Sequence, residues 1–73
     1  MALKYPVIFE RTSDGGWGAY PPDFPGVGIV ADTIENARRD IGTAIALHIQ
    51  AMRDDGIAVP KPAESLEYVE VGS

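Results

Sequence analysis

The stretch Ala19–Thr33, AYPPDFPGVGIVADT, decides between two different folds. Within it, Gly26–Ala31 fits the G-x-G-x-x-A form of the dinucleotide-binding fingerprint, which belongs to a parallel α/β fold. That fingerprint needs its glycines between a strand and a helix, so that the phosphates meet the helix N-terminus. Here the glycines follow a proline and precede β-branched residues, so we reject a nucleotide site. The prolines within residues 21–25 exclude a helix and predict a rigid turn between two strands.

Strand patterns lie on both sides of this turn. Residues 4–12 alternate apolar side chains with others, which predicts a strand, and Ser13–Gly16 has the composition of a tight hairpin turn. Trp17–Tyr20 returns as a second strand, and Val27–Ala31 is short and β-branched enough for a third. The sequence therefore predicts an antiparallel meander.

A long helix is predicted to follow the third strand. Asp32 and Thr33 are both good N-caps, and apolar residues then recur at helical spacing as far as Met52. The helix should end at residue 54 or 55, with Gly56 as its C-terminal cap. Gly42 lies inside it at a cost of about 1 kcal/mol relative to alanine. Close approach to the sheet and tolerated drift both remain open as explanations.

The last predicted element is a strand from Leu66 to Val71, after an extended link. The order is then β-β-β-α-β, an α+β fold with a small antiparallel sheet and one long helix packed on one face. We expect residues 1–73 to form a single domain with no separate DNA-binding domain.

Composition narrows the classes of function. The chain has 73 residues, no cysteine and a net charge of −5, so direct binding to DNA or RNA is not expected from this chain alone. A basic partner suits it better. Its first residues lack a signal-peptide core and no stretch is long and apolar enough to span a bilayer, which favours a cytoplasmic protein without membrane contact.

Catalytic patterns are weak. Four carboxylates (Glu10, Asp14, Asp23 and Asp32) invite a two-metal hydrolase, but the predicted elements do not make them converge. The lone His48 falls on the apolar side of the helix and has no partner nucleophile. We therefore expect no enzyme, no metal and no cofactor, and keep a small metal-dependent hydrolase as a distant alternative.

Aromatic residues gather around the second strand and the turn after it. Trp17, Tyr20 and Phe24, with the neighbouring Asp23, are candidates for contact with a protein partner, because aromatic side chains anchor interfaces. Packing in the core is the alternative, since large aromatics also dominate small cores.

One sheet face should remain apolar and uncovered. Ile8, Tyr20 and Val30 alternate with the residues assigned to the helix side and so should lie together on the other side. An apolar face favours a symmetric assembly, so we expect these residues to mediate a homo-oligomer.

The chain also resembles the HicB-like antitoxin family from about Tyr5 to Pro62. The motifs that carry this resemblance are Asp14-Gly15-Gly16-Trp17, Pro22-Asp23-Phe24-Pro25-Gly26, Asp32-Thr33 and Asp55-Gly56-Ile57-Ala58-Val59-Pro60. The resemblance implies a truncated ribonuclease-H-like fold without nuclease activity. It also implies an antitoxin that covers the RNA-binding or active site of a small basic HicA-type toxin, an RNA-cleaving protein.

The resemblance leaves one alternative function open, and the sequence departs from many members of the family in one respect. A solitary HicB-like interaction module without a toxin partner is the alternative function. Many members continue into a DNA-binding domain that represses their operon, whereas this sequence stops at Ser73, so we do not expect operator binding by this chain alone.

Overall fold

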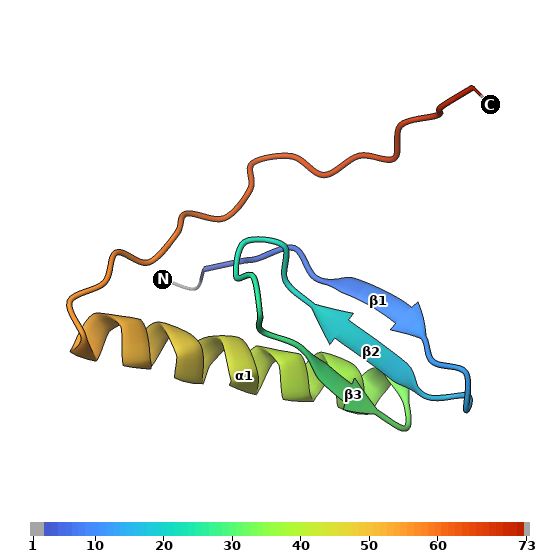
Figure 1. The fold of residues 1–73 in the computed structure, drawn as a ribbon, viewed down its shortest axis with the longest axis horizontal. Helices are drawn as coiled ribbons and strands as arrows, with labels where there is room; N and C mark the ends of the chain where they lie inside the picture. The colour runs from blue at the N-terminus through green and yellow to red at the C-terminus, as the bar shows by residue number, and fades with distance from the viewer. Residues whose placement is uncertain (1–2, 73) are drawn as a thin grey trace.

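The computed structural model describes residues 3–72 as a three-stranded sheet followed by one helix. The strands are β1 (Ile8–Arg11), β2 (Trp17–Tyr20) and β3 (Ile29–Ala31), and the helix is α1 (Ile34–Asp54). The sheet is antiparallel with the order β1-β2-β3, so the strands form a simple meander (Figure 1). The predicted α+β fold is confirmed.

The strand register sorts the side chains onto two faces. Phe9 lies opposite Ala19, and Ala19 lies opposite Ile29, which makes one row across the sheet on the helix side. Ile8 lies opposite Tyr20 and belongs to the other side, because successive side chains of a strand alternate. We call this other side the outer face; it is formed by Ile8, Glu10, Gly18, Tyr20 and Val30.

Both ends of α1 are capped as the sequence predicts. The Thr33 hydroxyl accepts a hydrogen bond of 3.1 Å from the backbone N–H of Asn36 and so satisfies one free amide of the first turn. At the other end, Gly56 has a φ of +70°, a left-handed conformation that glycine adopts without strain. The N–H of Ile57 then donates to the Met52 carbonyl over 2.8 Å, closing a Schellman-type end.

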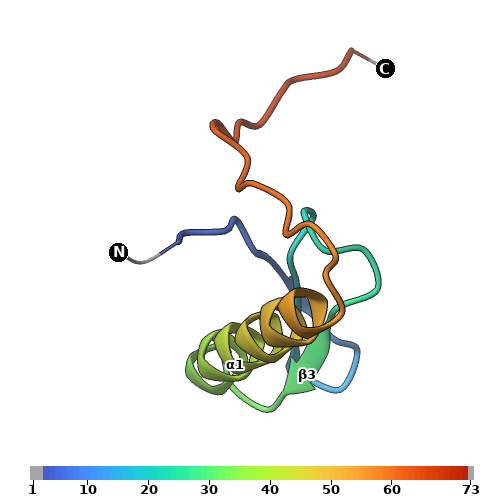
Figure 2. The same cartoon turned by 90° about the vertical axis from the view of Figure 1, so that its left-hand side faces the viewer.

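The core lies between the sheet and one stripe of the helix. α1 lies on one face of the sheet, as Figure 2 shows, and its main contacts are with β2 and β3. The helix therefore covers the β2–β3 half of that face more fully than the part formed by β1. The buried hydrophobic residues are Ala19, Phe24, Ala37, Ile41 and Ile45. Few residues are fully buried, as expected for so short a chain.

Residues 21–28 join β2 to β3, and we call them the connector. The connector consists of two successive turns, in agreement with the predicted rigid turn. The Pro21 carbonyl accepts from the N–H of Phe24, and the Phe24 carbonyl accepts from the N–H of Val27, each over 3.1 Å. Gly26 has a φ of +89° within the second turn. The chain then enters β3 and not a helix, so the glycines cannot serve as a dinucleotide loop.

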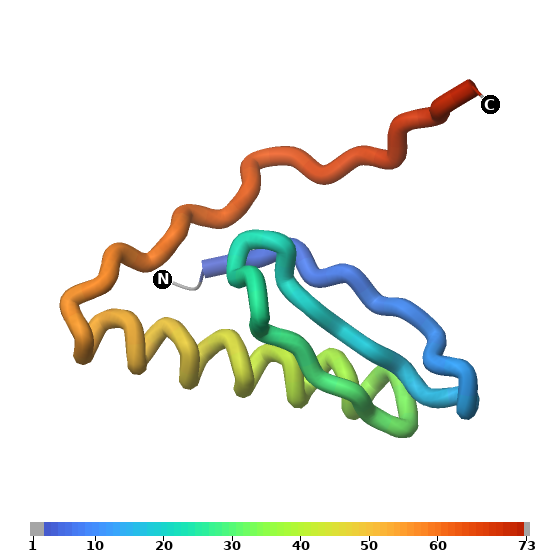
Figure 3. Tube along the Cα trace, in the orientation of Figure 1, coloured from blue at the N-terminus to red at the C-terminus, as the bar shows by residue number. Residues whose placement is uncertain are grey.

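The predicted strand from Leu66 to Val71 is wrong for this sheet. Residues 57–72, which we call the arm, contain neither helix nor strand (Figure 3). The Tyr5 hydroxyl donates to the Pro60 carbonyl over 2.7 Å. This bond fixes the start of the arm beside the segment that precedes β1. The N–H of Ala63 donates to the Asp23 carboxylate, and beyond Ala63 the arm leads away from sheet and helix in both ribbon views, so its backbone meets no strand edge (Figures 1 and 2).

Candidate functional site

The outer face carries exposed apolar side chains. Val30 is 72% exposed and Tyr20 is 40% exposed, while Ile8 is half-buried. A hydrogen bond to Glu10 raises the pKa of Tyr20, because ionising the phenol would place two negative charges side by side. The register therefore brings Ile8, Tyr20 and Val30, the three residues proposed for self-association, onto one surface. Glu10, which bonds to the Tyr20 hydroxyl, lies on the same surface.

The residues proposed for partner contact do not share one surface. Trp17 lies on the helix side of β2, where the Arg11 guanidinium stands 5.0 Å from its ring centroid, whereas Tyr20 belongs to the outer face. Asp23 lies in the connector, and its carboxylate accepts a hydrogen bond of 3.2 Å from the N–H of Ala63 in the arm. Trp17, Tyr20 and Asp23 remain accessible from three different directions.

Phe24 belongs to the core. Its side chain is 2% exposed and packs edge-on against the rings of Tyr5 and His48, at centroid distances of 4.8 and 5.6 Å. Phe24 thus packs the connector against α1 and against the segment that precedes β1. His48 supplies a packing contact from an otherwise exposed position.

Two of the carboxylates line one hollow but serve the backbone. Asp14 and Asp32 border a depression of about 360 Å³ between the hairpin turn and the start of α1. Hydrogen bonds from the Thr12 hydroxyl and the Gly16 N–H lower the pKa of Asp14. The amide of Asn36 does the same for Asp32 over 2.8 Å. Both carboxylates stabilise local structure, and across residues 3–72 no three His, Cys, Asp or Glu side chains gather as metal ligands do.

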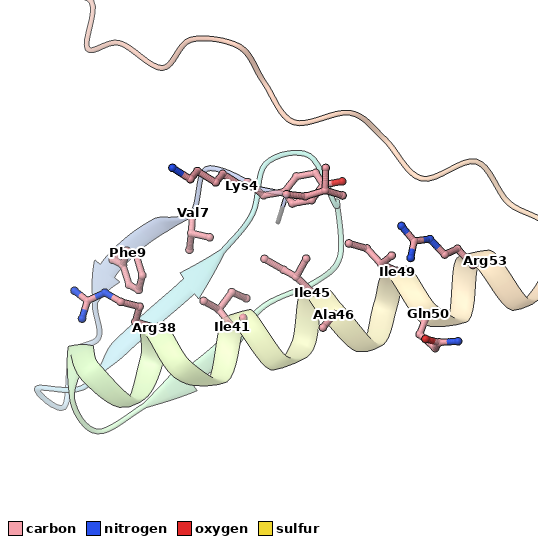
Figure 4. A pocket seen from close by; sticks show the side chains of 13 residues that line it. Lys4, Val7, Phe9, Arg38, Ile41, Ile45, Ala46, Ile49, Gln50 and Arg53 are labelled. Atoms are coloured by element: carbon pink, nitrogen blue, oxygen red, sulfur yellow. The ribbon is translucent and has the colours of Figure 1, made fainter. Parts of the chain in front are cut away.

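An apolar groove that sequence reasoning missed runs between α1 and the segment leading into β1. It has a volume of about 750 Å³, and Figure 4 shows side chains from the two elements facing each other across it. Its apolar lining includes Val7, Phe9, Ile41, Ile45 and Ile49. Its basic residues are Lys4, Arg38 and Arg53. We refer to these eight residues as the groove.

The groove exists because α1 contacts β2 and β3 more than β1, so the side chains of residues 3–72 cover the helix-side face of β1 only in part. One signal in the sequence could have revealed it. Arg38, Ile41, Ile45, Ile49 and Arg53 follow one another at spacings of three or four, which places them on one stripe of a helix. Such a stripe has an apolar middle and two basic ends.

Within residues 3–72, no helix is both long enough and apolar enough to cross a bilayer. The candidate binding surfaces are the outer face, the groove and the hollow between Asp14 and Asp32.

Comparison with known proteins identifies the family. The sequence model of the HicB-like antitoxins of bacterial toxin–antitoxin systems matches residues 5–71. Two UPF0150 proteins of Synechocystis sp. are 37% and 33% identical to this chain; the matches cover 80% and 92% of this chain and 73% and 92% of theirs.

A longer relative comes from a phage. An uncharacterized 14.9 kDa protein of Haemophilus phage HP1 is 32% identical over 67 residues, which are 92% of this chain but only 50% of the phage protein. This chain thus spans half the length of that relative. No solved structure matches significantly. The match of the family model over nearly the whole sheet, helix and arm means that the chain belongs to the HicB-like antitoxin family.

Proposed function

We propose that this chain is a non-enzymatic antitoxin that binds and neutralises a small basic RNA-cleaving toxin of the HicA type. Membership of the HicB-like family supports a toxin partner, and the net charge of −5 fits a basic one. An acidic protein that covers a basic RNA-binding face competes with the phosphate backbone for the same charges. Attraction between opposite charges also speeds the encounter. The place of action is the cytoplasm, where the toxin meets its RNA.

The outer face is the surface that we assign to partners. Tyr20 and Val30 expose apolar surface there that no element within residues 3–72 covers, and aromatic side chains with a polar tip are favoured interface anchors. This face takes the toxin when toxin is present and a second copy of the chain when it is absent. Trp17 lies on the opposite side of β2 and Asp23 in the connector, so a partner reaches them only by extending beyond the outer face.

Coexpression tests this proposal. A small basic open reading frame next to the gene is expressed alone and together with this chain; the expected result is growth arrest alone, and relief with a copurifying complex together. Val30→Lys places a charge on the outer face and is expected to weaken the complex at least tenfold, measured by calorimetry. Leu47→Lys, on an exposed position of the helix, is the matched control and is expected to leave binding unchanged.

Other outcomes favour other functions. If no basic neighbour binds this chain, the result favours a solitary HicB-like module. RNA cleavage by the purified chain that needs Mg²⁺ or Mn²⁺, and that disappears in Asp23→Asn or Asp32→Asn, would support the hydrolase instead. A sequence-specific gel shift of duplex DNA by this chain would contradict the expectation from its six basic residues.

A further inference from the structure

The end of the arm exposes apolar side chains that a single chain does not cover. Leu66 is 67% exposed and Tyr68 is fully exposed, and Val69 and Val71 are similarly open to solvent. Extended apolar segments of this kind gain free energy when a strand edge and an apolar surface accept them. The same chain has both, because β1 is an edge of the sheet and the groove runs along it.

We propose that the arm of one copy docks in the groove of a second copy, and that the second copy returns its own arm in exchange. The ligand of the groove is thus an acidic, apolar, extended segment of the same chain. The exchange is reciprocal and closes with two copies, since each contributes one arm and one groove. The proposal stands on the arm and the groove alone and does not depend on the toxin.

Charge favours this occupant. The groove carries Lys4, Arg38 and Arg53, half of the chain's six basic residues. The arm carries Glu64, Glu67 and Glu70. Opposite charges on two surfaces that are otherwise apolar favour their pairing and disfavour a copy of the groove meeting itself.

The pattern of the arm selects which of its faces enters. In an extended segment Glu64, Leu66, Tyr68 and Glu70 share one face, with apolar side chains in the middle and a carboxylate at each end. The groove has the same arrangement with the opposite charge. The other face of the arm has Glu67 beside Val69 and Val71, so it would press a carboxylate onto the apolar middle of the groove, at a desolvation cost.

The lengths agree as well. Arg38 and Arg53 stand fifteen residues apart on α1, which is about 22 Å at 1.5 Å per residue. Glu64 and Glu70 are six residues apart, which is about 20 Å in an extended chain at 3.3 Å per residue. One extended segment is therefore long enough to reach both basic ends of the groove that Figure 4 shows, while its apolar residues cover the half-buried Val7, Phe9 and Ile49.

The path of the arm favours a second copy over the chain's own groove. The arm is attached at Pro60 to the Tyr5 hydroxyl and at Ala63 to the Asp23 carboxylate, on the side of the connector. After these attachments it leads outward, away from its own helix (Figures 1 and 2). A segment held in this direction is presented to a neighbour.

A charge exchange between two variants tests the proposal on the 73-residue chain. The arm variant is Glu64→Lys with Glu70→Lys, and the groove variant is Arg38→Glu with Arg53→Glu. All four side chains are exposed, so circular dichroism should show an unchanged helix. Each variant alone is expected to self-associate at least tenfold more weakly than the natural chain in sedimentation equilibrium, and an equimolar mixture is expected to restore the assembly. Glu67→Lys, on the other face of the arm, is the control and should change the association less than threefold.

A crosslink distinguishes exchange between copies from an arm that folds back. The chain has no cysteine, so Ala46→Cys in the lining of the groove and Leu66→Cys in the arm are the only thiols of a double variant. Oxidation is expected to give a covalent dimer on non-reducing denaturing electrophoresis. A link within one chain, or no link at all, would overturn the proposal. So would a natural chain that sediments as a 7.8 kDa monomer at high micromolar concentration, or a mixture of charge variants that fails to assemble.

Discussion

Replacing Gly42 by alanine should stabilise the protein. Gly42 lies inside α1, and a Cβ built on it meets nothing within 4 Å apart from the helix itself. The added methyl group therefore meets no steric resistance, and the gain is the difference in helix propensity, about 1 kcal/mol. For a domain of this size, about 1 kcal/mol corresponds to a rise in Tm of roughly 4–8 °C. The substitution is made in a background of Glu64→Lys with Glu70→Lys, so that no arm lies over the groove that Gly42 borders.

The same chemical change at Gly56 supplies the matched control with the opposite sign. Gly56 has a φ of +70°, so the Cβ of an alanine there is strained by about 1–2 kcal/mol. Thermal unfolding followed by circular dichroism should give a higher Tm for Gly42→Ala and a lower Tm for Gly56→Ala. A lower Tm for Gly42→Ala would refute the reasoning, because it would mean that another part of the chain packs against this position.

Two further predictions concern the core and the acid range. Phe24→Ala removes a buried ring at a cost of roughly 3–5 kcal/mol out of the roughly 4–11 kcal/mol expected for this length, so the Tm measured by circular dichroism should fall by more than about 10 °C, or the fold should be lost. His48→Ala, at an exposed position, should remain folded, and a native-like Phe24→Ala would show that Phe24 is not a core residue. The pKa of Asp14 is lowered below its ordinary value of 3.8 in the folded state, so its contribution to stability is fully present above pH 3.8 and declines as the pH falls through the lowered native value. Asp14→Asn should flatten the Tm profile below pH 3.8, and an unchanged profile would contradict the role of its hydrogen bonds.

Local signals in the sequence account for most of the fold. The prolines and Gly26 announce the turn between β2 and β3, and Thr33 and Gly56 mark the two ends of α1 within a residue. These features are local, because a cap or a tight turn depends on a few adjacent residues. The first strand is shorter than predicted, since only Ile8–Arg11 pairs with β2 although the alternating pattern begins earlier.

Features that depend on distant contacts are harder to predict. The apolar composition of residues 66–71 is typical of a strand, but composition does not identify the edge with which a strand pairs. The sequence left Phe24 open between partner contact and core packing, and its contacts with Tyr5 and His48 make it a core residue. The groove was missed for a related reason, because it results from the position of α1 over β2 and β3.

The two surfaces proposed for assembly share no residue, which leads to a last prediction. The outer face offers Tyr20 and Val30, whereas the exchange of arms uses the groove on the helix side and the arm itself. Substitutions that are far apart and share no partners act additively, so Val30→Lys and the arm variant (Glu64→Lys with Glu70→Lys) should each remove one step of the assembly. The combined variant should then sediment as a 7.8 kDa monomer.

Salt gives an independent measure of the same separation. The arm and the groove attract each other partly through exposed charges, which are screened over about 8 Å at physiological ionic strength. Association through the arm, measured in the Val30→Lys variant, should therefore weaken as the salt concentration rises. Association through the apolar outer face, measured in the arm variant (Glu64→Lys with Glu70→Lys), should hold or strengthen in sulfate, which favours apolar burial. If both variants respond to salt in the same direction, the two surfaces are not separate, because a single interface would then carry both the charges and the apolar contacts.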